Sequence, residues 1–228
     1  MKSEKIKKFW NIANGNEIIL DGYISETSWY GDEAGITPKA FKKDLESLNG
    51  DITVSINSPG GDVFAASSIY SMIKEYKGKV TVKITGIAAS AASVVAMAGD
   101  KVLINPTGYM MIHNPSMIAV GEKTDMEVAA KALDEIKEGI INAYAQKTGK
   151  ERDEISKMMD DETWMSAQTA IEMGFADGVL YDDTQGDKKN TDNDEPQSVQ
   201  PENKVNDSLD LLKAKFNLKL LYNGGKKR

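Results

Sequence analysis

The stretch that most limits the fold of this chain runs from residue 51 to residue 86. A strand-like run over 51–57 is followed by the turn SPGG, by a run with apolar residues at helical spacing, and by a second strand-like run over 79–86. Strand, helix and strand in this order form a βαβ unit, whose two strands are parallel and joined by a right-handed crossover. The sequence therefore predicts an α/β fold built on a parallel sheet.

Further elements are predicted on both sides of this unit. A strand over 17–23 precedes it, followed by a helix with Thr37 as N-cap and Pro38 in its first turn. After the unit, the patterns predict a short helix of small residues up to residue 97, strands in KVLIN and GYMMIH, a long amphipathic helix over 124–146, helices over 151–159 and 166–173, and a short strand around 178–181. The long helix repeats apolar residues at Ala129, Leu133, Ile136, Ile140 and Tyr144.

The composition changes after residue 181. Residues 182–206 are rich in Asp, Asn, Gln and Lys and have almost no apolar side chains, which predicts a disordered acidic linker. Residues 207–228 place Leu209, Leu212, Phe216 and Leu220 on one helical face beside several lysines, which predicts a basic amphipathic helix. Such a helix docks on a partner, folds back on the body or associates with itself. We therefore expect one folded domain over 1–181, the linker over 182–206 and the helix over 207–228.

Composition also excludes several classes of function. The chain has no cysteine and one histidine, which excludes a disulfide framework, a cysteine nucleophile and a metal site built from several histidines. A Mg²⁺ or Ca²⁺ site made only of carboxylates is not excluded by composition, but no metal or other cofactor is predicted. The net charge of -7 argues against nucleic-acid binding. The longest weakly polar run, 86–99, is shorter than the roughly 18–20 residues that span a membrane. With no apolar signal-peptide region near the N-terminus, we expect a cytoplasmic protein.

Two turns between strands and helices are candidates for chemistry. In SPGG (58–61), adjacent glycines at a helix N-terminus let backbone N–H groups approach an oxyanion, although many such turns need glycine only for their shape. In GIAAS (86–90), Ser90 stands at a strand-to-helix junction, where the N–H of Ala91 points toward whatever Ser90 attacks. The alternative is that Ser90 and Ser93 only pack or cap a helix of small residues.

His113 is the third candidate, because an activated serine needs a base and this chain has no other histidine. It ends a strand-like run 23 residues after Ser90, which is enough chain to return to the same edge of the sheet. An acid to orient the imidazole is available in the group at 160–162. The order serine, histidine, acid differs from that of α/β-hydrolases and of the two best-known serine protease folds, so a different fold is required.

Four motifs in this order, INSPGG, GIAAS, MIHNP and WMSAQTAIEMGFADGVL, resemble the ClpP family, the proteolytic subunits of the Clp protease, and in particular its phage and prophage members. The resemblance runs from about Asp51 to Leu180. It implies that Ser90 is the nucleophile, that His113 is the general base, and that the backbone N–H groups of Gly61 and Ala91 form the oxyanion hole. The family's aspartate is replaced by Glu162, which we expect to be the triad acid, with Asp161 as the alternative if the register is shifted.

The same resemblance implies a ClpP/crotonase-like spiral of βαβ units in which the helix over 124–146 is a handle between rings. A polypeptide substrate and a homo-oligomeric ring, a heptamer or a double ring, are expected. An AAA+ unfoldase is left open as a partner, because the N-terminal region has no match to the family's axial-loop segment. In a phage setting the implied role is processing of capsid or scaffold proteins, with the C-terminal helix as a docking element.

Three alternatives compete with a serine endopeptidase. A catalytically inactive ring or scaffold component keeps the fold for assembly alone, and is compatible with the altered acid. A crotonase-type acyl-CoA enzyme uses a glycine turn to stabilise a thioester enolate. A Ser-Lys dyad requires a lysine at a motif position, and none aligns there.

Overall fold

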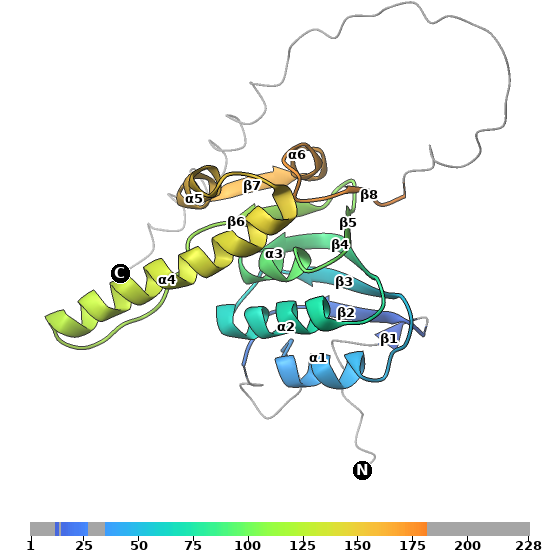
Figure 1. Ribbon diagram of the computed structural model, residues 1–228, viewed down its shortest axis with the longest axis horizontal. Coiled ribbons are helices and arrows are strands. Elements are labelled where there is room, and N and C mark those ends of the chain that lie inside the picture. The colour runs from blue at the N-terminus through green and yellow to red at the C-terminus, as the bar shows by residue number, and fades with distance from the viewer. Residues whose placement is uncertain (1–11, 14, 27–34, 182–228) are drawn as a thin grey trace, which may run out of the picture. The chain divides into compact units, whose positions relative to one another are not determined.

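The computed structural model describes residues 12, 13, 15–26 and 35–181, which lie in the first of the two units of the chain, Met1–Thr184. These residues form the strands β1 (Ile12–Ala13), β2 (Glu17–Asp21), β3 (Ile52–Ser58), β4 (Val80–Ala89), β5 (Lys101–Ile104), β6 (Tyr109–Ile112), β7 (Thr163–Ser166) and β8 (Gly178–Val179). The helices are α1 (Pro38–Leu45), α2 (Val63–Glu75), α3 (Ala91–Ala96), α4 (Lys123–Thr148), α5 (Arg152–Asp160) and α6 (Ala167–Glu172) (Figure 1). The linker predicted over 182–206 and the helix predicted over 207–228 lie outside the described residues and stay predictions.

The strands form one sheet with the order β1-β2-β3-β4-β5-β8, and β6 joins it between β4 and β7. Strands β3 and β4 are parallel, in a register that pairs Ile52 with Val80, so the predicted βαβ unit is confirmed. Strand β4 is long enough to have two partners on one side. Residues 81–84 pair with β5 and residues 87–89 pair with β6. As a result, the carboxyl ends of β4 and β6 lie side by side.

Helices α1, α2 and α3 cover one face of the sheet (Figure 1). The predicted start of α1 is confirmed, because the Thr37 side chain accepts a hydrogen bond from the Ala40 N–H at 3.2 Å. At the start of α2, Asp62 caps the N–H groups of Phe64 and Ala65 in the same way. The core lies between the sheet and these helices and includes fully buried side chains such as Val54, Val82, Ile84 and Ile69.

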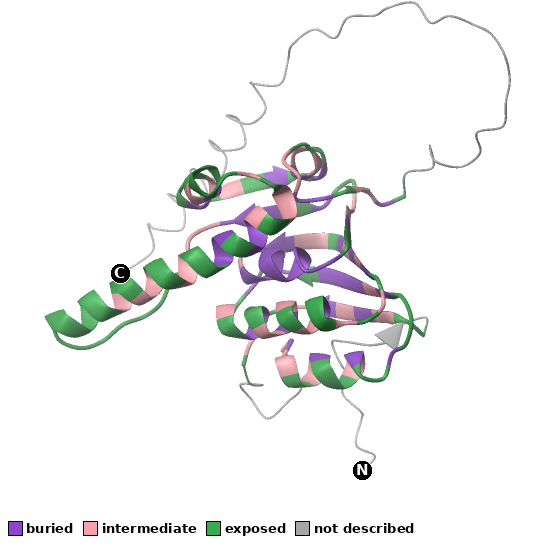
Figure 2. Cartoon of the chain, in the orientation of Figure 1, coloured by how far each residue is buried: buried purple, intermediate pink, exposed green. Residues whose placement is uncertain are grey.

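The long amphipathic helix predicted over 124–146 is α4. Its buried residues, Ile140, Ile141, Ala143 and Tyr144, all lie in its second half, which packs on α3 and α5. The first half extends beyond the body together with the loop that precedes it (Figures 1 and 2). In that loop Ile118 is 97% exposed and Val120 is 92% exposed. In the projecting half of α4, Met126 is 39% exposed and Val128 is 61% exposed.

Two strands were not predicted, β7 and the two-residue β1. Residues 163–166, TWMS, form β7, which pairs with β6 in antiparallel orientation, and the helix predicted from residue 166 begins after it as α6. None of the helices in the described residues is long and apolar enough to cross a membrane.

Candidate active site

Ser90 occupies the turn between β4 and α3, and its backbone is strained there. Its φ of 54° and ψ of −128° lie outside the regions that residues with a side chain normally occupy. The Ser90 N–H donates to the Met111 carbonyl at 2.9 Å, which continues the pairing of β4 with β6 for one more residue. The residues of α3 that follow are all buried. The strand pairing and the buried helix hold the turn in place, and the Ser90 side chain is half-exposed.

The structure brings Ser90 and His113 together, as the strand ends predicted. Residue Ala89 of β4 pairs with Met111 of β6, so the two strands end at the same level of the sheet. The Ser90 Oγ and the His113 Nε2 are 2.7 Å apart, which is hydrogen-bond distance. This is the contact through which a histidine removes the proton of a nucleophilic serine.

The glycine turn after β3 is pressed against the Ser90 turn. Gly60 has a φ of 102°, and a Cβ placed on it would lie 2.6 Å from the Ala89 oxygen and 2.8 Å from the Ser90 Cβ. The turn is held from its other side by Ile24, whose N–H donates to the Gly60 oxygen at 2.9 Å and whose oxygen accepts from the Asp62 N–H at 2.9 Å. Glycine is therefore required at residue 60 by both its conformation and its close contacts.

The two backbone N–H groups expected to bind an oxyanion are unpaired. Among the described residues, neither the Gly61 N–H nor the Ala91 N–H donates a hydrogen bond to another group. The Ala91 nitrogen lies 3.0 Å from the Cβ position of Gly60, so the two turns meet at this point. Unpaired backbone donors beside a serine are what an oxyanion hole requires.

The expected acid makes no hydrogen bond to His113 among the described residues. In the described part of the chain, no hydrogen bond joins His113 to Asp161 or to Glu162. Glu162 has a φ of 47°, and its Oε1 accepts a hydrogen bond from the Trp164 Nε1 at 3.2 Å. The antiparallel pairing of β6 with β7 ends with Ile112 and Thr163, so His113 and Glu162 are the residues directly beyond this last pair.

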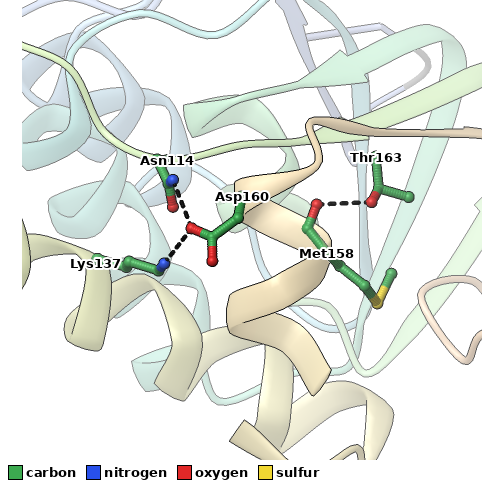
Figure 3. A network of polar contacts seen from close by, with 5 residues as sticks. All are labelled: Asn114, Lys137, Met158, Asp160 and Thr163. Atoms are coloured by element: carbon green, nitrogen blue, oxygen red, sulfur yellow. Dashed lines mark hydrogen bonds and ion pairs between the residues drawn. The ribbon is translucent and has the colours of Figure 1, made fainter. Parts of the chain in front are cut away.

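A third acid, Asp160, fixes the residue that follows His113 (Figure 3). Its Oδ1 accepts from the Asn114 Nδ2 at 2.8 Å and from the Lys137 Nζ at 2.6 Å. The hydrogen bond from Lys137 and then that from Asn114 lower the pKa of Asp160. Because the pKa is lower in the folded than in the unfolded chain, the ionised carboxylate stabilises the fold at neutral pH. This contribution is lost as the pH falls through the lowered pKa.

Sequence reasoning missed a buried contact behind Ser90. The Ser93 Oγ lies 2.6 Å from the Ser90 oxygen and 2.8 Å from the Tyr144 hydroxyl of α4. From the sequence, Ser93 is predicted only as a packing or capping residue and Tyr144 only as part of the apolar stripe. The available signal was the hydroxyl of Tyr144, because a buried tyrosine usually needs a hydrogen-bond partner. As for metals, the described residues contain no group of three or more His, Cys, Asp or Glu placed to hold an ion.

Comparison with known proteins gives the family. Residues 33–183 match the family model "Clp protease". The chain belongs to the Clp protease family. It is 35% identical over 163 residues to the ATP-dependent Clp protease proteolytic subunit 1 of Chlamydia muridarum, covering 70% of this chain and 85% of that protein. It is 36% identical to the subunit of the same name from Protochlamydia amoebophila, covering 71% of this chain and 82% of that protein.

A solved structure of the same class supports the fold. A point mutant of ClpP1 from Listeria monocytogenes superposes with a TM-score of 0.65 at 28% identity, covering 75% of this chain and 94% of that chain. The chain is therefore a ClpP-type serine peptidase subunit with the α/β fold and the long helix expected of it. These similarities favour the peptidase over the crotonase-type acyl-CoA enzyme.

Proposed function

We propose that this Clp family member hydrolyses peptide bonds with Ser90 as nucleophile and His113 as general base. The observation that carries the proposal is the 2.7 Å contact between the Ser90 Oγ and the His113 Nε2 at the ends of two paired strands. Ser90 attacks the carbonyl carbon of the scissile bond while His113 takes the hydroxyl proton. His113 then gives this proton to the departing amine, and water releases the acyl group from Ser90 by the same route.

The backbone N–H groups of Gly61 and Ala91 are assigned to the oxyanion hole. Two observations support this assignment: both donors are unpaired among the described residues, and the glycine turn touches the Ser90–Ala91 segment. Ala91 stands where the family usually has methionine, but only its N–H takes part. Such donors stabilise the negative charge of the tetrahedral intermediate more strongly than that of the substrate carbonyl.

Covalent labelling tests this assignment. A fluorophosphonate probe reacts with serines that an adjacent base activates, so we expect one adduct on the full-length protein, mapped to Ser90 by mass spectrometry. The adduct should be absent from the His113→Ala variant. Labelling at another serine would overturn the assignment. An assembled oligomer without any adduct would instead favour the inactive ring or scaffold component.

For the acid we propose Glu162, because the strand register makes it the neighbour of His113 across β6 and β7. Rotation of its side chain away from Trp164 would bring the carboxylate toward the imidazole. Loss of a triad acid costs up to about 10⁴-fold in kcat, so we expect Glu162→Gln to lower the turnover of a fluorogenic peptide by at least roughly 100-fold. Asp161→Asn is the matched control and should stay within about threefold of the native rate. The reverse ranking would make Asp161 the acid.

The assembly that we propose is a homo-oligomeric ring, a heptamer or a double ring, that encloses the site. Exposed apolar side chains in this region support the assembly, because they would be covered by a neighbouring subunit. They are Ile118 and Val120 of the loop and Met126 and Val128 of α4. An AAA+ partner and a cytoplasmic location are part of the same proposal, and the names of the relatives include the words "ATP-dependent". A phage origin and a role in capsid maturation are supported by none of the comparisons and rest on the sequence motifs alone.

A further inference from the structure

Directly behind the nucleophile, two hydroxyl groups are linked to the Ser90 carbonyl. The Ser93 Oγ donates to the Ser90 oxygen at 2.6 Å, and the Ser93 N–H donates to the same oxygen at 3.0 Å. A serine hydroxyl carries one hydrogen, and here that hydrogen is used toward Ser90. The hydroxyl of Tyr144, 2.8 Å from the Ser93 Oγ, is therefore the donor in the second contact. The resulting path runs from Tyr144 through Ser93 to the Ser90 oxygen.

Both residues of this path are rigidly held. Ser93 is fully buried in α3, and Tyr144 is 1% exposed. The Tyr144 ring packs edge-on against Phe175 with ring centres 5.6 Å apart, which fixes its direction. Burial raises the pKa of the Tyr144 hydroxyl, so the group stays protonated and keeps its role as donor at neutral pH.

The Ser90 oxygen and the Ala91 N–H belong to one planar trans peptide, so they point in opposite directions. A hydrogen bond that fixes the oxygen therefore also fixes the direction of the N–H. The backbone of Ser90, with φ 54° and ψ −128°, is in a sparsely populated region and keeps this conformation only if its surroundings impose it. The Ser93 hydroxyl and the Ser93 N–H both donate to the Ser90 oxygen, so they are placed to impose this conformation.

We infer that Ser93 and Tyr144 are positioning residues that hold the Ser90–Ala91 peptide in the orientation in which the Ala91 N–H faces the oxyanion. The inference rests on the proposed function, in which Ser90 is the nucleophile and Ala91 supplies an oxyanion donor. The role of Ser93 is direct, because its hydroxyl touches the peptide, whereas Tyr144 acts only through Ser93.

The competing explanation is purely structural: Ser93 satisfies the hydroxyl of a buried tyrosine, and the pair contributes to stability alone. The two explanations differ in what a kinetic experiment measures. A misdirected oxyanion donor lowers kcat and leaves KM unchanged, because the donor acts in the transition state and not on the bound substrate. A structural pair changes the thermal midpoint and leaves kcat unchanged once the protein is folded.

The variants are Tyr144→Phe and Ser93→Ala in the full-length protein, after the native protein has been shown to label at Ser90. Absence of that label is a failure of the proposed function and not of this inference. Removal of a whole oxyanion donor costs roughly 10²–10³ in kcat, so misdirection should cost less: about tenfold for Ser93→Ala and about threefold for Tyr144→Phe, both at unchanged KM. Tyr76→Phe is the matched control, because the buried Tyr76 hydroxyl has no partner among the described residues. Its kcat should equal the native value.

The double variant, Ser93→Ala with Tyr144→Phe, tests the order of the path. Because Tyr144 acts through Ser93, the double variant should lose no more kcat than Ser93→Ala alone. The inference is overturned if both single variants keep the native kcat while their thermal midpoints fall. It is also overturned if the two losses multiply in the double variant, since each hydroxyl would then act independently.

Discussion

Ser90→Ala is expected to reduce peptide hydrolysis by at least about a thousandfold, because loss of the proposed nucleophile leaves only the proposed oxyanion donors and substrate binding to assist the reaction. The change removes one oxygen atom from a half-exposed side chain. Alanine has the same Cβ as serine, so the strained backbone of residue 90 is no worse accommodated. The variant should keep the native circular dichroism spectrum and oligomer mass, while turnover of a fluorogenic peptide falls to background.

The matched control for this prediction is Ser71→Ala, which removes the same atom from an exposed serine of α2. Its Oγ donates only to the Ser67 carbonyl one turn earlier, so activity should stay at the native level. More than one tenth of native turnover in Ser90→Ala would exclude Ser90 as the nucleophile. The same loss in both variants would indicate that the assay reports assembly and not chemistry.

Gly60→Ala should have the second largest effect, at least about 100-fold in kcat/KM. The new Cβ would meet the Ala89 oxygen at 2.6 Å, the Ser90 Cβ at 2.8 Å and the Ala91 nitrogen at 3.0 Å, so the backbone has to shift. The atoms that shift are those of the Ser90 turn, including the Ala91 nitrogen of the proposed oxyanion donor. A displacement of about 1 Å in such a site costs on the order of 100-fold in rate. The positive φ of residue 60 adds about 1–2 kcal/mol of destabilisation.

Gly50→Ala separates crowding from backbone strain. Gly50 also has a positive φ, 72°, but a Cβ there meets nothing within 4 Å. This variant should lose a similar amount of stability by thermal unfolding, with native kcat/KM per folded protein. Native activity in Gly60→Ala would mean that the glycine turn does not press on the Ser90 turn. Equal losses of activity in both variants would attribute the effect to instability.

The sequence predicted the parts of the site that depend on strand ends. Ser90 follows a strand with clear alternation, and His113 follows a second, continuously apolar strand-like run. Parallel strands bring their carboxyl ends to one edge of a sheet. Their contact therefore follows from topology alone. The short strand β7 was missed because four residues between two helices carry too little periodicity to be recognised. The extension of β4 to Ala89 was missed because the small residues of GIAAS have low strand propensity.

Contacts between side chains were predictable only in part. The contact of Asp160 with Lys137 and Asn114 joins α5 to α4 and to the residue after His113. No spacing of residues in the sequence predicts this contact. Likewise, the direction of the Glu162 side chain depends on the indole of Trp164, two residues away. Tertiary packing determines which rotamer each of these side chains adopts, and the pattern of residue types along the sequence does not predict that rotamer.

The contact of His113 with Ser90 also makes the site easy to observe in solution. The chain has a single imidazole, so the two carbon-bound ring protons of one residue are the only histidine signals in its magnetic resonance spectrum. Those signals need no assignment by mutagenesis, and they arise from the group that touches the Ser90 hydroxyl. Any inhibitor, partner or assembly step that reaches the site can therefore be followed through one pair of resonances in the unmodified protein.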